Sequence, residues 1–396
     1  MPKSKVSRIE RIEHYLVDII QQPGADQNQP FSVRMLLGFL KGVSLVFRGI
    51  VGIRYVFYEL GILRRFPLGC QVISIGNVTA GGTGKTPVTE KFARELHACG
   101  RKVAILSRGY RRKERPWWQR MFSEVIEPPL VVSDGKRILL DAATGGDEPY
   151  MLASNLPGVC VVVDRNRVKA GRYAIRRFGC DTLILDDGFQ YQKLKHSLEV
   201  VLVDKTNPFG NGNMLPRGVL REPAKNLRRA DFIFITKSDG DSKEVRGLVR
   251  QFNEKAEIIE CRHAPRVLRD VYTREELPLE WLKGKTLATL SGIAVPQGFE
   301  NSLRTLGAKV IHCERYADHH RYEPSEIIEA LNRAADRGCD ALLTTEKDAV
   351  RFPRLETTPV PAYYLRVDIE ILAGAENFHD AVDHICNAKP REERAI

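Results

Sequence analysis

The stretch that decides the fold lies between residues 72 and 96. It reads Val72-Ile-Ser-Ile75, then Gly76-Asn-Val-Thr-Ala-Gly-Gly-Thr-Gly84-Lys85-Thr86-Pro87, and then an apolar pattern of helical spacing up to Leu96. A short apolar strand, a glycine-rich loop, Gly-Lys-Thr and a helix form the context that a phosphate-binding P-loop requires. The glycines allow backbone N–H groups to close around phosphate oxygens at the positive end of the helix. The predicted nucleotide-binding loop comprises Thr79, Ala80, Gly81, Gly82, Thr83, Gly84, Lys85 and Thr86.

One residue of this loop departs from the usual pattern G-x-x-x-x-G-K-T. Thr79 occupies the position of the first glycine, but three glycines follow it closely. We expect Lys85 to reach the β and γ phosphates of the nucleotide, and the Thr86 hydroxyl to bind Mg²⁺.

Continuous apolar runs predict the other strands of a parallel sheet covered on both faces. These runs span residues 103–106, 159–163, 182–185, 200–203 and 232–235. Ligands of open α/β sheets sit at the carboxyl ends of the strands. Asp186 and Asp187 follow the run 182–185 and resemble a Walker B end, so we predict that they hold Mg²⁺. A simple turn or a helix cap is the alternative for an aspartate after a strand.

The chain length and the strand pattern predict two main domains. At about 100–200 residues per domain, 396 residues allow two to four. After residue 262 the pattern restarts, with strands at 287–290, 309–313, 341–344 and 363–367 and a helix that Pro324 opens, its apolar face formed by Ile327, Ile328, Leu331, Ala334 and Ala335. We predict an α/β protein with a polar extension (1–30), an amphipathic membrane-associated helix (31–66), a P-loop domain (67–262) and a smaller Rossmann-like α/β domain with a tail (263–396).

The segment from Phe31 to Leu63 is apolar but interrupted by cations. Arg34, Lys41, Arg48 and Arg54 leave no run of about 18 uncharged residues that could span a bilayer. Their spacing of seven, seven and six residues predicts one basic stripe on a helix. A basic stripe beside a wide apolar face is typical of a helix in a membrane interface. A helix buried against the body of the protein and a true span are the alternatives.

Composition limits the class of protein further. Hydrophobic residues make up 43% of the chain, which excludes a mainly disordered protein or a collagen. The eight cysteines form no C-x-x-C pair, and we interpret them as free thiols in a reducing cytosol. The N-terminal residues lack the apolar core of a signal peptide. The net charge of +11 suits nucleic acid, an anionic membrane or a phosphorylated substrate, and composition does not choose among them.

Two short segments outside the P-loop carry candidate catalytic groups. Asp147 and Glu148 precede a helix, where acidic residues often serve as caps, but a kinase also needs a carboxylate that accepts the proton of the acceptor hydroxyl. Asp147 is a candidate by position. His319 and His320 are adjacent, point in different directions and are therefore poor partners for one metal.

Seven motifs in order resemble the tetraacyldisaccharide 4′-kinase family, the lipid A kinases of Gram-negative bacteria. The resemblance runs from about residue 31 to about residue 367. The motifs are Gly76-Asn-x-Thr-x-Gly-Gly-Thr-Gly-Lys-Thr-Pro87, Ser107-Arg-Gly-Tyr110, Gly146-Asp-Glu-Pro149, Asp186-Asp-Gly-Phe-Gln190, Leu215-Pro-Arg-Gly-Val-Leu-Arg-Glu-Pro223, Asp318-His319 and Thr345-Glu-Lys-Asp-Ala-Val350.

The resemblance implies an activity and roles for particular residues. It implies transfer of the γ-phosphate of ATP, with Mg²⁺, to the 4′-hydroxyl of a lipid A disaccharide 1-phosphate at the cytoplasmic face of the bacterial inner membrane. Asp147 would be the base and His319 its partner, with Glu148 beside Thr86, Asp186 and Asp187 as a metal ligand. The substrate-binding residues would be Asn77, Ser107, Arg108, Tyr110, Arg167, Gln190, Arg217 and Arg221. The partners expected are this lipid and the membrane surface, with neither nucleic acid nor a protein partner.

Another P-loop class is the main alternative. Thr236-Lys237-Ser-Asp239 resembles the Asn-Lys-x-Asp element that recognises guanine in GTPases and related metallochaperones. However, its first residue is Thr, and Asp-Asp-Gly lacks the Asp-x-x-Gly spacing of those proteins. A non-enzymatic membrane or nucleic-acid binder would have no need of the Gly-Lys-Thr loop.

Overall fold

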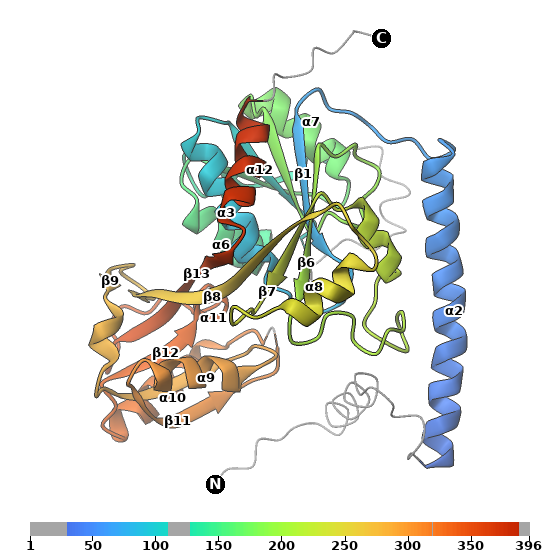
Figure 1. Ribbon diagram of the computed structural model, residues 1–396. Coiled ribbons are helices and arrows are strands. Elements are labelled where there is room, and N and C mark those ends of the chain that lie inside the picture. Colours follow the sequence, from blue (N-terminus) through green and yellow to red (C-terminus); the bar gives the residue numbers. More distant parts are fainter. Residues whose placement is uncertain (1–29, 110–126, 319, 388–396) are drawn as a thin grey trace. The chain divides into compact units, whose positions relative to one another are not determined.

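The computed structural model describes residues 30–109, 127–318 and 320–387 (Figure 1). The chain divides into two compact units that are each discontinuous in sequence. The first comprises Met1–Thr89, Asp181–Arg262 and Ile371–Ile396, and the second comprises Glu90–Cys180 and His263–Glu370. The domain boundaries expected from sequence, at residues 66 and 262, stay a prediction.

The first unit contains the strand that precedes the P-loop, at the centre of a parallel sheet. Its strands lie in the order β8-β7-β6-β1-β5, and each neighbouring pair is parallel. They span β1 (Gln71–Asn77), β5 (Thr182–Asp186), β6 (Leu198–Asp204), β7 (Phe232–Thr236) and β8 (Glu257–Asp270), of which β8 ends in the second unit. Every residue of β1 and β5 is buried, which explains why these strands read as continuous apolar runs.

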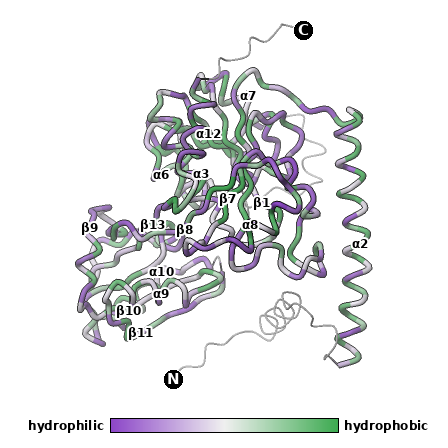
Figure 2. The backbone as a smooth tube through the Cα atoms, viewed as in Figure 1, coloured by the Kyte–Doolittle hydropathy of each residue, from purple (hydrophilic) through white to green (hydrophobic). Residues whose placement is uncertain are grey.

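Helices and loops cover this sheet and bury its apolar side chains. They are α2 (Phe31–Glu59), α3 (Lys85–Ala98), which continues into the second unit, η1 (Ala224–Arg229), α8 (Lys243–Arg250) and α12 (Ala375–Asn387). Val201, Val203, Ile233 and Ile235 from the strands pack with Phe189 in one core cluster. The strands β1, β6 and β7 form the apolar interior that Figure 2 shows.

The second unit contains two groups of strands. In the first group β2 (Val103–Ser107) pairs in parallel with β4 (Cys160–Val163), which pairs antiparallel with β3 (Leu130–Asp134). In the second group four parallel strands lie in the order β11-β10-β12-β13, with β10 at Thr286–Ser291, β11 at Lys309–Arg315, β12 at Ala341–Thr345 and β13 at Ala362–Ala373. The four strands expected after residue 262 are therefore present as one parallel group, and the separate smaller domain stays a prediction.

Short helices connect these strands. They are α5 (Ala142–Gly145), α6 (Asp147–Asn155), α7 (Arg167–Phe178), η2 (Leu279–Leu282), α9 (Pro296–Thr305), α10 (Pro324–Asp336) and α11 (Glu346–Ala349), and β9 (Glu276–Leu277) pairs with β8. On α10 the side chains of Ile327, Leu331 and Ala334 are buried as expected. Ile328 is exposed, so its assignment to the apolar face was wrong. One residue turns a helix by about 100°, which carries Ile328 away from the buried face.

The helix α2 is shorter than the segment 31–66 predicted from sequence, and it ends at Glu59. Only Leu37 and Ser44 are fully buried, and the Ser44 hydroxyl donates a hydrogen bond of 2.8 Å to the Met214 carbonyl. Phe47 and Val51 pack against the core cluster of the first unit. Apolar residues continue along the whole helix in Figure 2, and the exposed ones are Phe31, Met35, Leu36, Phe39, Val43, Leu45, Val46, Ile50, Ile53, Val56 and Phe57.

By length and composition, α2 could also cross a membrane. Its best window of 18 residues has a mean hydropathy of 1.8, and 29 residues span about 43 Å, more than the hydrocarbon thickness of about 30 Å. The basic stripe predicted on it is correct only in part. Arg34, Lys41 and Arg48 share one side, but six residues turn a helix by about 600°, which is about 120° short of two full turns. Arg54 therefore lies elsewhere and donates to the Gln190 carbonyl.

Candidate active site

The P-loop joins the end of β1 to the start of α3 in the first unit. Gly81 and Gly84 have φ angles of +118° and +81°, which side-chain-bearing residues rarely adopt. The Ala80 amide donates to the Val219 carbonyl at 2.6 Å, and the Thr236 hydroxyl donates to the Thr83 carbonyl at 2.9 Å. These two bonds fix the loop from both ends. Thr236, which was considered only as part of a guanine-recognition motif, therefore supports the P-loop.

Lys85 is the first residue of α3 and contacts the end of β5. Its Nζ lies 3.3 Å from Asn77 Oδ1 and 3.6 Å from Asp187 Oδ1. Arg221 donates to both Asp187 oxygens, at 2.7 and 2.8 Å, and to Asn77 Oδ1 at 3.2 Å. We call Asn77, Lys85, Asp187 and Arg221 the Asp187 cluster. It places two cations beside the P-loop.

Two oxygen-bearing residues remain as candidates for binding Mg²⁺ in this unit. Thr86 is the second residue of α3, and the buried Asp186 ends β5. Both Asp187 oxygens accept bonds from Arg221, so that carboxylate acts first as an anchor for cations. Within residues 30–109, 127–318 and 320–387, no three His, Cys, Asp or Glu residues form a metal-binding group. Mg²⁺ is usually bound through one or two carboxylates, waters and substrate phosphates, so the donor set of Thr86 and Asp186 fits it.

Asp147 lies in the second unit as the first residue of α6. The N-cap of this helix is Gly146, whose φ is +98°, and no side chain caps the helix, so Asp147 is not its cap. Its Oδ2 accepts a hydrogen bond of 2.8 Å from Arg351 Nε. Glu148 Oε1 lies 3.8 Å from Lys347 Nζ, which is also 3.9 Å from Asp318. Residues 345–351 thus contact the Gly-Asp-Glu-Pro motif.

The remaining predicted site residues are distributed over both units. In the first unit, Gln190 Nε2 donates to the Asn77 carbonyl at 2.9 Å, and Arg217 is buried in a loop. In the second unit, Ser107 ends β2, and Arg167 is buried at the start of α7. Arg108 is exposed after β2, and Tyr110 and His319 lie outside the described residues. The roles of all these residues stay predictions.

Three contact residues were not singled out from sequence. Lys347 and Asp348 belong to a motif that was quoted without individual roles, and Arg351 directly follows it. A usable signal was present, because Lys347 and Arg351 are separated by one helical turn, the spacing that places two cations on one face. Nothing in the local pattern indicated that this face meets Asp147, which precedes it by 204 positions.

A glycine-rich loop joins a buried parallel strand to a helix, and its lysine lies 3.6 Å from a carboxylate at a strand end. This arrangement defines a P-loop nucleotide-binding protein. The model of the tetraacyldisaccharide-1-P 4′-kinase family matches residues 36–387, and the chain belongs to this family. The alternative of a GTPase or metallochaperone gains no support.

Curated relatives and a solved structure agree with this assignment. The chain is 40% identical to a tetraacyldisaccharide 4′-kinase of Anaeromyxobacter sp. (strain K), over 91% of this chain and 94% of the relative. It is 35% identical to that of Halothermothrix orenii, over 87% and 89%. The crystal structure of "apo" form LpxK from Aquifex aeolicus in complex with ATP superimposes with a TM-score of 0.71 at 29% identity, covering 89% of this chain and all of that chain.

Proposed function

We propose that this protein transfers the γ-phosphoryl group of ATP to the 4′-hydroxyl of a tetraacyldisaccharide 1-phosphate, a lipid A precursor. The observation that carries the phosphoryl-transfer step is the position of Lys85, at the start of α3 and 3.6 Å from Asp187. Membership of the kinase family supports the choice of acceptor.

The nucleotide is bound by the P-loop of the first unit. Backbone amides of residues 79–86 surround the phosphates at the N-terminus of α3, where the helix dipole favours negative charge. Lys85 contacts the β and γ phosphates, and the Asp187 cluster fixes the lysine before the nucleotide arrives. Thr86 and Asp186 would hold Mg²⁺, which would supply positive charge against the negative charge that develops during transfer.

Asp147 accepts the proton of the 4′-hydroxyl as the general base. It is partly exposed at the start of α6, as a group that must meet a substrate requires. Its hydrogen bond with Arg351 holds the carboxylate in one orientation. His319 is proposed as a second partner of this carboxylate, and Glu148 as an additional metal ligand, on the basis of the family resemblance.

A lipid acceptor explains the exposed face of α2. Moving an acyl chain out of a bilayer costs about 0.8 kcal/mol per CH₂, so the enzyme must come to the membrane. A cavity of about 480 Å³ lies between α2 and residues 223–228, with apolar walls that include Val51, Ile53 and Val56. Arg48, Lys225 and Arg228 also line it and supply positive charge for an anionic headgroup. These features support contact of α2 with lipid, and membership of the kinase family supports a place at the cytoplasmic face of the inner membrane.

The test is a transfer assay on the purified protein, with the lipid acceptor in mixed micelles and ATP and GTP compared side by side. We expect phosphate on the 4′-oxygen with ATP and Mg²⁺. Asp147→Asn should lower kcat by about 10²–10⁴ while the KM for ATP changes little. Failure of the unmodified protein to phosphorylate the lipid would contradict the proposed function. Recovery of Asp147→Asn at high Mg²⁺ would instead assign Asp147 to the metal and contradict the base alone.

A further inference from the structure

Residues 345–351 present a cation to each member of the carboxylate pair at the start of α6. Arg351 Nε lies 2.8 Å from Asp147 Oδ2, and Lys347 Nζ lies 3.8 Å from Glu148 Oε1. The two contacts differ in quality. The ion pair of Lys347 with Glu148 is long, and both side chains are partly exposed, so this pair contributes little to stability. The Arg351 contact is a directed hydrogen bond from a buried guanidinium.

Arg351 is the fixed member of its pair with Asp147. Its side chain is 4% exposed, against 27% for Asp147. Arg351 Nη1 lies 3.2 Å from Oδ1 of Asp348, a carboxylate with no exposed surface. Because Asp348 holds one edge of the planar guanidinium, Arg351 presents its Nε donor to Asp147 in a set plane, which a lysine cannot do.

Asp348 is itself held by bonds from several elements. The Gly292 amide donates to its Oδ2 at 3.1 Å, the Thr345 hydroxyl to the same oxygen at 2.6 Å, and the Tyr322 hydroxyl to its Oδ1 at 3.0 Å. Burial, together with Asp348, raises the pKa of Tyr322 above its usual value, so this phenol stays a donor. Asp348 therefore has no freedom to follow Arg351, and it anchors the arginine to the strand ends of the second unit.

We propose that Arg351 is the positioning residue of the kinase reaction, and that it sets the orientation of Asp147 from the anchor Asp348. This inference rests on the proposed role of Asp147 as the base. An unrestrained aspartate at the first turn of a helix samples several rotamers, only one of which directs a given oxygen at the acceptor. A displacement of about 1 Å at a reacting group can cost about 10²-fold in rate. Arg351 removes this freedom without touching the substrate.

Substitution of Arg351 tests this role through the separation of kcat from KM. For Arg351→Ala we expect kcat to fall about 10- to 100-fold, with the KM for ATP and for lipid within about threefold of the parent. Methylguanidinium added to this variant should restore part of kcat, because it occupies the vacated space and donates to Asp147. Arg351→Lys keeps the charge and guards against loss of folding, and it should retain more activity than Arg351→Ala. The matched control is Arg354→Ala, which removes an exposed arginine three positions away and should leave kcat unchanged.

A double-mutant cycle with Asp147→Asn separates the failure of this inference from failure of the base assignment. If Arg351 acts through Asp147, the double variant Asp147→Asn/Arg351→Ala loses no more kcat than Asp147→Asn alone. Multiplicative losses, or a folded Arg351→Ala with the parent's kcat, would overturn the positioning role and leave the base intact. A lower melting temperature with unchanged kcat per folded molecule would show a merely structural arginine. Full activity of Asp147→Asn would refute both the assignment of Asp147 as the base and the positioning role of Arg351.

Discussion

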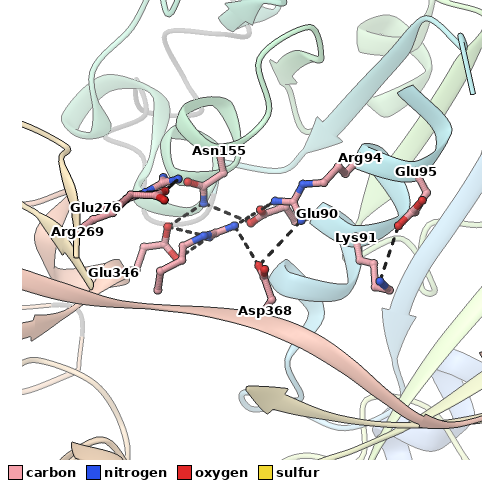
Figure 3. Close-up of polar contacts among 10 residues, drawn as sticks. Glu90, Lys91, Arg94, Glu95, Asn155, Arg269, Glu276, Glu346 and Asp368 are labelled. Carbon is pink, nitrogen blue, oxygen red and sulfur yellow. Dashed lines mark hydrogen bonds and ion pairs between the residues drawn. The ribbon is translucent and has the colours of Figure 1, made fainter. Parts of the chain in front are cut away.

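Replacing Arg366 with methionine should lower the free energy of unfolding by more than the loss of a surface ion pair does. Arg366 lies on β13 in the second unit and donates to both Glu346 oxygens, at 2.9 and 2.8 Å, and to Glu90. Its side chain is 6% exposed, and those of Glu90 and Glu346 are similarly buried. Figure 3 shows Glu90, Glu346 and Asp368 converging from three different elements. The substitution leaves these carboxylates without their central cation.

The size of the loss follows from the burial of the pair. Removing one partner of a buried ion pair typically costs about 3–5 kcal/mol, because a desolvated charge is left behind. Some compensation survives, since Asn155 Nδ2 still donates to Glu346 at 2.8 Å and to Glu90 at 3.2 Å, and Arg94 still contacts Glu90. We therefore expect a loss near the lower end of that range, about 3 kcal/mol.

The loss should depend on pH in a definite direction. Burial raises the pKa of Glu90 above its ordinary value of 4.5, even though Arg366 acts against this shift. A carboxyl with a raised folded-state pKa binds its proton more tightly when folded, so its stabilising effect is present at low pH and is lost as the pH rises through that pKa. Without Arg366 the folded-state pKa rises further. The variant should therefore lose most stability near pH 8 and less near pH 5.

Urea unfolding followed by circular dichroism measures the difference in the free energy of unfolding. Arg333→Met is the matched control, because Arg333 also forms a two-bond pair, with Glu314 at 2.8 and 2.8 Å, but its side chain is 39% exposed. We expect about 0–1 kcal/mol for this variant. Equal losses for the two variants, or a loss for Arg366→Met that grows as the pH falls, would refute the argument from burial.

Three other perturbations test the nucleotide site and α2. Lys85→Ala should lower turnover by about 10²–10³, because it removes a charge contact to the phosphates. The control Lys91→Ala, on the same helix, should not lower turnover. Parent-like turnover of Lys85→Ala would exclude Lys85 as the P-loop lysine. Asp186→Asn should raise the Mg²⁺ concentration needed for half-maximal turnover and recover at high Mg²⁺, and an unchanged metal dependence would assign the metal to other oxygens. Charge reversal of the basic stripe should weaken binding to anionic vesicles by about 1 kcal/mol per cation in a sedimentation assay, and unchanged binding would place this stripe away from the membrane. The residues reversed to Glu are Arg34, Lys41 and Arg48.

The strands could be predicted well from sequence because burial on both faces gives each one a continuous apolar run. The run 182–185 became β5 (Thr182–Asp186), and the run 232–235 became β7 (Phe232–Thr236). Helical faces were predicted less well, because one residue of error in angular position changes the environment of a side chain. Ile328 and Arg54 failed for this reason.

The P-loop could be predicted because its chemistry is local: the strand, the glycines and Lys85 are adjacent in the chain. Contacts between segments that are far apart in the sequence could not be predicted. Arg221 follows Asp187 by 34 positions, and its two hydrogen bonds to that carboxylate depend on how the loop after β6 folds back. Arg351 is separated from Asp147 by 204 positions. Local periodicity contains no information about such pairings, and the order of the motifs does not indicate which side chains contact one another.

The two arginines nevertheless follow one rule. Both tandem acidic pairs of the candidate site, Asp147-Glu148 and Asp186-Asp187, have one member bound by an arginine: Arg221 binds Asp187 and Arg351 binds Asp147. Arg221 donates to both oxygens of Asp187 and so fixes the plane of that carboxylate, whereas Arg351 donates to Oδ2 of Asp147 and fixes the direction of that oxygen. At the end of β5 the proposed metal ligand is therefore Asp186, because both oxygens of Asp187 accept hydrogen bonds from Arg221. At the start of α6 the acid bound by arginine is instead the proposed base. A metal ion orients its own ligands, so a base needs a fixed direction more than a metal ligand does. An arginine beside an acidic pair thus has a different proposed role at each place, and the cycle of Asp147 and Arg351 variants tests the second role directly.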